Sequence, residues 1–102
     1  MSKETLKGQA TDEQIKAWKE KYEPIFFTKS DGHIAYFRKP SRQEVSYAMS
    51  LQSDPMKASE SLLKSCCIGG SEVFYKEPGY IIGAADLVET LMDIKKVELG
   101  KL

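Results

Sequence analysis

The sequence holds few side chains of the types that carry out chemistry: one histidine, two cysteines and scattered carboxylates. Because His33 is the only histidine, any Ser-His-Asp or Cys-His arrangement would have to use it. It falls in a predicted turn beside Asp31, and a turn tip supplies neither a pocket nor a partner for acid-base catalysis. We therefore expect an exposed, structural histidine, and the sequence argues against nucleophilic catalysis.

The two cysteines, Cys66 and Cys67, are neighbours in the chain. A disulfide between adjacent residues is strained, so we expect reduced thiols. Neighbouring side chains on a helix point about 100° apart, which makes a shared zinc ion difficult, and no Cys-x-x-Cys pair or second histidine completes a ligand set. We interpret both as small apolar residues at a helix end, one of them partly exposed.

The charged residues give no strong field, because 15 basic side chains balance 15 acidic ones. Asp86, Glu89 and Asp93 follow helical spacing and form an acidic stripe, which we interpret as a solvated face. Gly69-Gly70 lacks the spacing and the lysine of a phosphate-binding loop. The sequence thus predicts a protein that is not an enzyme, with no catalytic residue, no cofactor and no metal.

One local basic patch does occur where a helix is expected to begin, at Arg38, Lys39 and Arg42. Aromatic residues lie beside it and could stack on bases: Phe26, Phe27, Tyr36 and Phe37. Three charges are few for a nucleic-acid interface, and surface solubility explains them as well. Nucleic-acid binding therefore stays an alternative and not the first interpretation.

Residues 1–10 read as a flexible tail, and residues 11–102 as a single globular domain. A first helix is expected to begin at Thr11, with Gln14 at capping-box spacing, and to end before Pro24. Apolar runs 25–28 and 34–37 flank Asp31-Gly32, which predicts a β-hairpin. Because two strands alone are marginal in water, the hairpin must lay a face on the helices or take a third strand from a partner chain. Its edge is thus a candidate surface for homo-oligomer formation.

Two short helices form the centre of the predicted fold. Ser41 and Glu44 make a capping box that starts a helix over about 42–52. Asp54-Pro55 starts a second over about 55–67, which Gly69-Gly70 should end. A long amphipathic helix is expected over about 80–99. We predict an α+β fold, a small mainly helical domain with about four helices and one N-terminal β-hairpin.

No apolar run is long enough to span a bilayer, and the polar N-terminus lacks a signal-peptide core. We therefore expect a cytoplasmic protein.

Several short motifs in order resemble a known family: the strand exit 37–44, the cap Asp54-Pro55, the helix end 62–66, the loop 70–72 and the closing helix. This order is similar to that of small tail assembly chaperones of long-tailed bacteriophages and prophages. The similarity spans residues 36–99, while the N-terminal helix and the Asp31-Gly32 hairpin depart from the family pattern.

The resemblance implies a protein without enzymatic activity that works in the host cytoplasm. Such chaperones coat the long tape-measure protein, keep it soluble and recruit tail-tube subunits. A groove that holds a helix needs adaptable apolar anchors, and methionine suits that task. The candidate partner-binding residues are Phe37, Arg38, Lys39, Arg42, Met49, Met56 and Met92.

Three alternatives stay open from the residues alone. The basic patch 38–42 could serve a small nucleic-acid-binding module, whose affinity would fall steeply with salt. The chain could be a structural prophage protein without a chaperone role. A small enzyme or ligand-binding domain is the third, although no constellation of residues points to it.

Overall fold

The computed structural model describes residues 6–51, 53–93, 95 and 97–102. Its frame is an antiparallel sheet with the strand order β1-β2-β3, formed by β1 (Ile25–Ser30), β2 (His33–Arg38) and β3 (Cys67–Gly70). The predicted hairpin is confirmed, with Ile25 opposite Arg38 and Ser30 opposite His33. Asp31 and Gly32 both have positive φ, 52° and 82°, as a two-residue hairpin turn requires. His33 therefore begins β2 and does not lie in the turn.

The third strand comes from the same chain, and the expectation that Gly69-Gly70 ends a helix is wrong, because both glycines lie in β3. Of the two ways in which the hairpin was expected to be stabilised, it lays one face on the helices, with Ala35 and Phe37 in the core. Gly70 has φ +105°, and a Cβ on it would lie 2.4 Å from the Cα of Ala35. A Cβ on Gly69 would lie 2.7 Å from the ring of Trp18. The two glycines thus allow the close approach of β3 to β2 on one side and of an aromatic ring to β3 on the other.

Six helices lie in the described part of the chain: α1 (Asp12–Lys21), α2 (Arg42–Ser50), α3 (Pro55–Cys66), α4 (Val73–Lys76), α5 (Pro78–Gly83) and α6 (Ala85–Met92). The three predicted helix starts are confirmed. Thr11 and Ser41 each form a capping box, and Asp54 Oδ1 accepts from the N–H of Lys57 at 3.1 Å. Each cap satisfies N–H groups that the first turn leaves without a partner.

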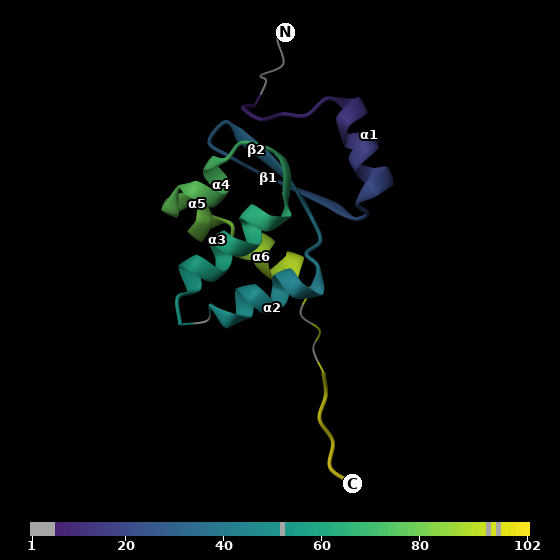
Figure 1. Cartoon of the computed structure of the whole chain (residues 1–102), viewed down its shortest axis with the longest axis vertical. Coiled ribbons are helices and arrows are strands. Elements are labelled where there is room, and N and C mark those ends of the chain that lie inside the picture. Colours follow the sequence, from purple (N-terminus) through teal and green to yellow (C-terminus); the bar gives the residue numbers. More distant parts are fainter. Residues whose placement is uncertain (1–5, 52, 94, 96) are drawn as a thin grey trace.

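The prediction of one long final helix is wrong in both the start and the end of that helix. Pro78 begins α5, the chain bends at Ala84, and α6 ends at Met92. Asp93 then takes a left-handed conformation, with φ 50°, and its N–H donates to Glu89 O and Thr90 O. Aspartate tolerates this conformation better than most residues, so Asp93 ends the helix well before residue 99, where it was expected to end. Residues 97–102 are exposed and run away from the body (Figure 1).

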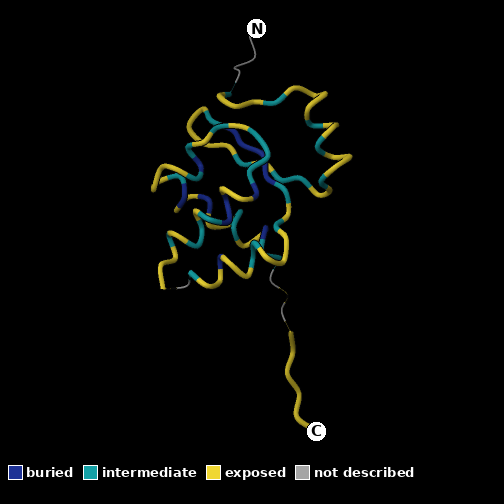
Figure 2. Tube along the Cα trace, viewed as in Figure 1, coloured by how far each residue is buried: buried dark blue, intermediate teal, exposed yellow. Residues whose placement is uncertain are grey.

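The sheet lies between two unequal layers. On one face, Ala35 and Phe37 pack into a buried core with Leu62, Leu63, Cys66, Phe74, Ile81 and Leu91 from the helices. On the other face, the ring of Trp18 in α1 lies 5.2 Å from that of Tyr36. Figure 2 shows the buried segments gathered where the strands meet the helices, while α1 carries no buried residue. The α+β class is thus confirmed, with more helices and one more strand than predicted.

Part of the predicted N-terminal tail pairs with the sheet. Lys7 N–H donates to Gly32 O at 2.8 Å, and Ile34 N–H donates to Lys7 O at 2.9 Å. Residues 1–5 of the predicted tail lie outside the described residues. The first described residues thus continue the β2 edge beyond the end of β3.

Candidate functional site

An apolar groove lies between α2, α3 and α6. It consists of two hollows, of about 290 Å³ and about 540 Å³, that share Met49 and Met92. We call this surface the Met49–Met92 groove. The smaller hollow is lined by Ala48, Met49, Pro55, Ala58, Ser59, Leu62, Val88 and Met92, and the larger by Lys39, Pro40, Arg42, Val45, Ser46, Met49, Leu91 and Met92.

The floor of the groove belongs to the core, and its rim is open. Ala48, Leu62 and Leu91 are at most 3% exposed. Met49 is 50% exposed, and Met92 is half-buried beside it. A solvent-facing apolar strip over a fixed floor is the kind of surface that another apolar side chain can cover.

The sequence places Met49 on this surface through the start of α2. Ser41 caps the helix, and Met49 follows the first helical residue, Arg42, by two turns. Both side chains thus project on one side, and both line the larger hollow. The Asp54–Pro55 start sets α3 alongside, so that Pro55 and Ala58 in its first turn form the opposite wall.

A bidentate ion pair fixes the end of β2 to the start of α2. The Nη1 and Nη2 atoms of Arg38 donate to the two carboxylate oxygens of Glu44 at 2.8 and 2.7 Å. Nη2 also donates to the carbonyl of Ser65 at 2.9 Å, which ties in the end of α3. The hydrogen bond from Arg38, together with those from Ser41, lowers the pKa of Glu44 to about 2 although partial burial opposes it. Arg38 therefore positions the helices and is not free to meet a partner.

The other two basic residues of the patch differ from each other. Lys39 Nζ donates to Asp93 Oδ2 at 3.0 Å, and the two side chains are 51% and 40% exposed. Hydrogen bonds from Lys95 and then Lys39 lower the pKa of Asp93. Arg42 is exposed and has no ion pair with any described residue. The rim of the larger hollow thus presents one uncommitted positive charge.

Four of the seven predicted partner-binding residues come together in the groove: Lys39, Arg42, Met49 and Met92. Phe37 does not, because it faces the core and is 0% exposed. Met56 is half-buried and packs against the core outside the groove. These two were selected by residue type and by their place in the chain, and the hairpin's exposed aromatic residue is Phe27 and not Phe37.

We did not single out Val88, Leu91 or Pro55 from the sequence as residues that line a groove. The available signal was the wide apolar arc of the final helix, which exceeds what one neighbour can cover.

The cysteines match their predicted role. Cys66 is fully buried in the core, Cys67 is half-buried, and both are free thiols. Desolvation raises the pKa of Cys66 to about 11 and also raises the pKa of Cys67. A thiol needs a lowered pKa to be a good nucleophile at neutral pH, so neither residue is activated.

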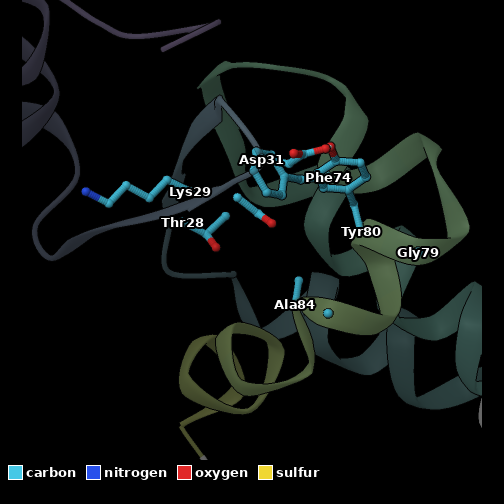
Figure 3. Close-up of a pocket in the computed structure, with 9 residues that line it drawn as sticks. Thr28, Lys29, Asp31, Phe74, Gly79, Tyr80 and Ala84 are labelled. Carbon is cyan, nitrogen blue, oxygen red and sulfur yellow. The ribbon is translucent and has the colours of Figure 1, made fainter. Parts of the chain in front are cut away.

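A second hollow, of about 350 Å³, lies between the hairpin turn and α5. Figure 3 shows Tyr80 and Asp31 pointing toward one another above Phe74, with Lys29 directed away. Tyr80 Oη donates to Asp31 Oδ2 at 3.3 Å, and its ring meets that of Phe74 edge to face at 5.3 Å. Burial, followed by the charge of Asp31, raises the pKa of Tyr80. This hydrogen bond joins the hairpin turn to α5, and we call this second site the hairpin hollow.

His33 is half-buried and does not line the hairpin hollow, so the prediction of an exposed histidine is wrong. Its Nδ1 lies 2.7 Å from the Oγ of Ser71, and its ring meets that of Tyr80 edge to face. A Ser-His pair needs a third group to orient the ring and donors to hold an oxyanion. The N–H of Ser71 is already bonded to Ile34 O, and Asp31 contacts Tyr80. The pair fastens β2 to the segment that follows β3.

Within residues 6–51, 53–93, 95 and 97–102, no three histidine, cysteine, aspartate or glutamate residues are arranged to hold a metal ion. Over the same residues, no helix combines the length and the apolar character needed to cross a bilayer. The chain matches no protein-family model, no curated protein and no solved structure with which it was compared.

Proposed function

We propose that this protein is a non-enzymatic interaction protein that holds an amphipathic helix of a partner polypeptide in the Met49–Met92 groove. This is the activity expected of a tail assembly chaperone-like protein whose partner is the helical tape-measure protein. The observation that carries the proposal is the continuous apolar surface formed by two hollows that share two methionines.

The shape of the groove favours a helix as its occupant. Its walls are three helices, and apolar residues of a helix at i, i+3, i+4 and i+7 form a stripe that fits between such walls. Met49 and Met92 have unbranched side chains that adjust to different partner residues. A protein that must cover many segments of one long helix needs that adaptability.

The charge on the rim favours an acidic partner helix. Arg42 is exposed and has no ion pair with any described residue, while Lys39 shares Asp93 with Lys95. A glutamate on the polar flank of the bound helix would meet Arg42 at the edge of the larger hollow. This contact is exposed, so it adds selectivity more than affinity.

The same contacts give less support to the alternatives. Two of the three basic side chains of the patch are engaged in ion pairs, and Tyr36 and Phe37 are buried, which leaves little to hold a nucleic acid. The thiols have raised pKa values, and among the described residues His33 is bonded to Ser71 with no third group that orients its ring.

The test uses two synthetic 20-residue helices with the same leucine stripe, one with glutamate and one with lysine on the polar face. We expect the glutamate peptide to bind and to bind more tightly than the lysine peptide at low salt. Met49→Asp should weaken binding about 30-fold or more, because burying one methionine is worth about 2 kcal/mol.

Tyr47→Asp is the matched control, since Tyr47 is 61% exposed on the same helix and lines neither hollow. Met49→Leu should restore binding. Equal loss of affinity in Met49→Asp and Tyr47→Asp, or no binding of either peptide, would refute the proposed site.

A further inference from the structure

The C-terminal segment carries apolar side chains that nothing in the described structure covers. Val97 is 83% exposed and Leu99 is 99% exposed. They stand two residues apart, the spacing that puts side chains on one face of a strand. Three lysines and one glutamate accompany them over residues 95–101. The segment is thus basic, with the alternation of an edge strand.

The sheet has a matching open surface along β1. Strand β1 pairs only with β2, and none of its backbone groups bonds to any other described segment. Beside this edge lies a hollow of about 420 Å³, lined by residues 25–28 of β1 and by Asp86, Leu87 and Thr90 of α6. Phe27, one of the residues that line this hollow, is 60% exposed.

From these two surfaces we infer that the segment around Val97–Leu99 of a second copy of this chain adds as a fourth strand to the free edge of β1. Val97 and Leu99 would then cover the hollow beside Leu87. An extended segment satisfies the open backbone groups of an edge strand and places alternate side chains in the pockets beside it.

The charge of the C-terminal segment favours binding at the β1 edge over binding in the Met49–Met92 groove. The groove has Lys39 and Arg42 on its rim, which would repel a basic segment. The hollow beside β1 is lined by Asp86 and by no basic residue. The inference therefore concerns a different surface from the proposed function and does not depend on it.

The position of the C-terminal segment favours addition of this segment from a second copy over folding back of the chain's own segment. Figure 1 shows residues 97–102 running away from the sheet, beyond the end of α6. Asp93, at the root of this segment, is held by Lys39 and Lys95. A two-fold arrangement would let each copy donate its segment and accept its partner's. The contact is short, so we expect dimers at a protein concentration on the order of 100 µM.

The experiment is analytical ultracentrifugation of the full chain over a concentration series, with hydrogen exchange of the β1 amides. We expect the full chain to form a dimer, and Val97→Ser combined with Leu99→Ser to leave a monomer whose β1 amides exchange faster. Ile82→Ser is the control, because Ile82 is equally apolar, is 65% exposed and lies on α5 outside the described hollows. This variant should still form the dimer.

A second measurement adds a labelled peptide of residues 93–102, blocked at both ends, to a chain that ends at Asp93. It should bind, and Asp86→Lys should weaken binding at least five-fold at low salt, whereas Met49→Asp should not. A full chain that stays monomeric, a double serine variant that stays dimeric, or peptide binding that responds to Met49→Asp and not to Asp86→Lys would overturn the inference.

Discussion

The Met49–Met92 groove and the hairpin hollow are both open depressions over a buried floor, yet they differ in what closes them. The groove has two methionines on its rim, and among the described residues no side-chain hydrogen bond joins α2, α3 and α6 across it; the Lys39–Asp93 bond lies at its edge. In the hairpin hollow, the hydroxyl of Tyr80 bonds to Asp31 across the opening, and the ring of Tyr80 packs on Phe74. One surface stays apolar and exposed, and the other is already used to join two elements of the fold.

This difference shows why residue type alone is a poor guide to function in this chain. The hairpin hollow gathers the more reactive groups, a tyrosine and an aspartate with His33 nearby, but Tyr80 donates to Asp31 and His33 is bonded to Ser71. The groove gathers side chains without reactive groups, and its apolar surface stays exposed. The surface with less chemistry is the better candidate for binding.

The largest expected effect is a loss of stability when a buried residue under either hollow is truncated. Leu91→Ala under the groove should lower the free energy of unfolding by about 2–5 kcal/mol, and Phe74→Ala under the hairpin hollow by about 3–5 kcal/mol, because each leaves a cavity in the core. Urea unfolding measures both. A loss below about 1 kcal/mol at either position would mean that the floor is not part of a close-packed core.

The next effect concerns the ion pair that sets the groove's α2 wall. Glu44→Gln should cost about 1–3 kcal/mol at neutral pH, since it removes the carboxylate that Arg38 and Ser41 bind. The folded-state pKa of about 2 lies below the ordinary value of 4.5, so this stability is present above about pH 4.5 and is lost as the pH falls toward 2.

Urea unfolding of the wild type and Glu44→Gln across this range measures the difference, with Glu60→Gln as the control for an exposed glutamate on α3. The two curves should converge near pH 2. A constant gap between them would show that the Glu44 carboxylate is not the group responsible.

A smaller effect concerns the charge on the rim of the groove, which should decide between the glutamate and lysine peptides. Arg42→Glu should reverse the preference between the glutamate and lysine peptides by about ten-fold at low salt and lose this effect at high salt, because the contact is exposed. Unfolding should be unchanged, since a glutamate is favourable in the first turn of a helix. Fluorescence anisotropy at two salt concentrations measures the reversal, and a preference that does not respond to salt would contradict it.

The smallest effect lies at the hairpin hollow. Tyr80→Phe removes the hydroxyl that donates to Asp31 but keeps the ring on Phe74, so peptide binding should be unchanged and the urea midpoint should stay within error. The same anisotropy and unfolding measurements apply. Weaker peptide binding in this variant would place the binding surface at the hairpin hollow.

Much of the fold was predictable because residues close together in the sequence determine where the helices begin and where the hairpin turns. Thr11, Ser41 and Asp54 start helices through contacts within four residues, and Asp31-Gly32 fixes the hairpin turn. The strand Cys67–Gly70 was not predictable in this way, because Gly69-Gly70 signals a helix end equally well. Its role depends on the close approach of Ala35 and Trp18, which are distant in sequence.

The candidate site was predictable only in part for the same reason. Met49 and Met92 were selected by residue type, and the structure brings them together from α2 and α6. Phe37 and Arg38 sit in the same sequence stretch, but the register of β2 turns Phe37 into the core, and Glu44 engages Arg38. Periodicity identifies an apolar face and does not say whether the fold covers it.

The most direct test of the proposed function is to map the bound glutamate peptide on the protein by nuclear magnetic resonance. Titration into isotopically labelled protein should shift the signals of Met49, Val88 and Met92, together with neighbouring amides of α2, α3 and α6, and leave those of Asp31 and Tyr80 in place. Shifts centred on Asp31 and Tyr80, or no shifts at all, would contradict the assignment of the Met49–Met92 groove as the partner-binding site.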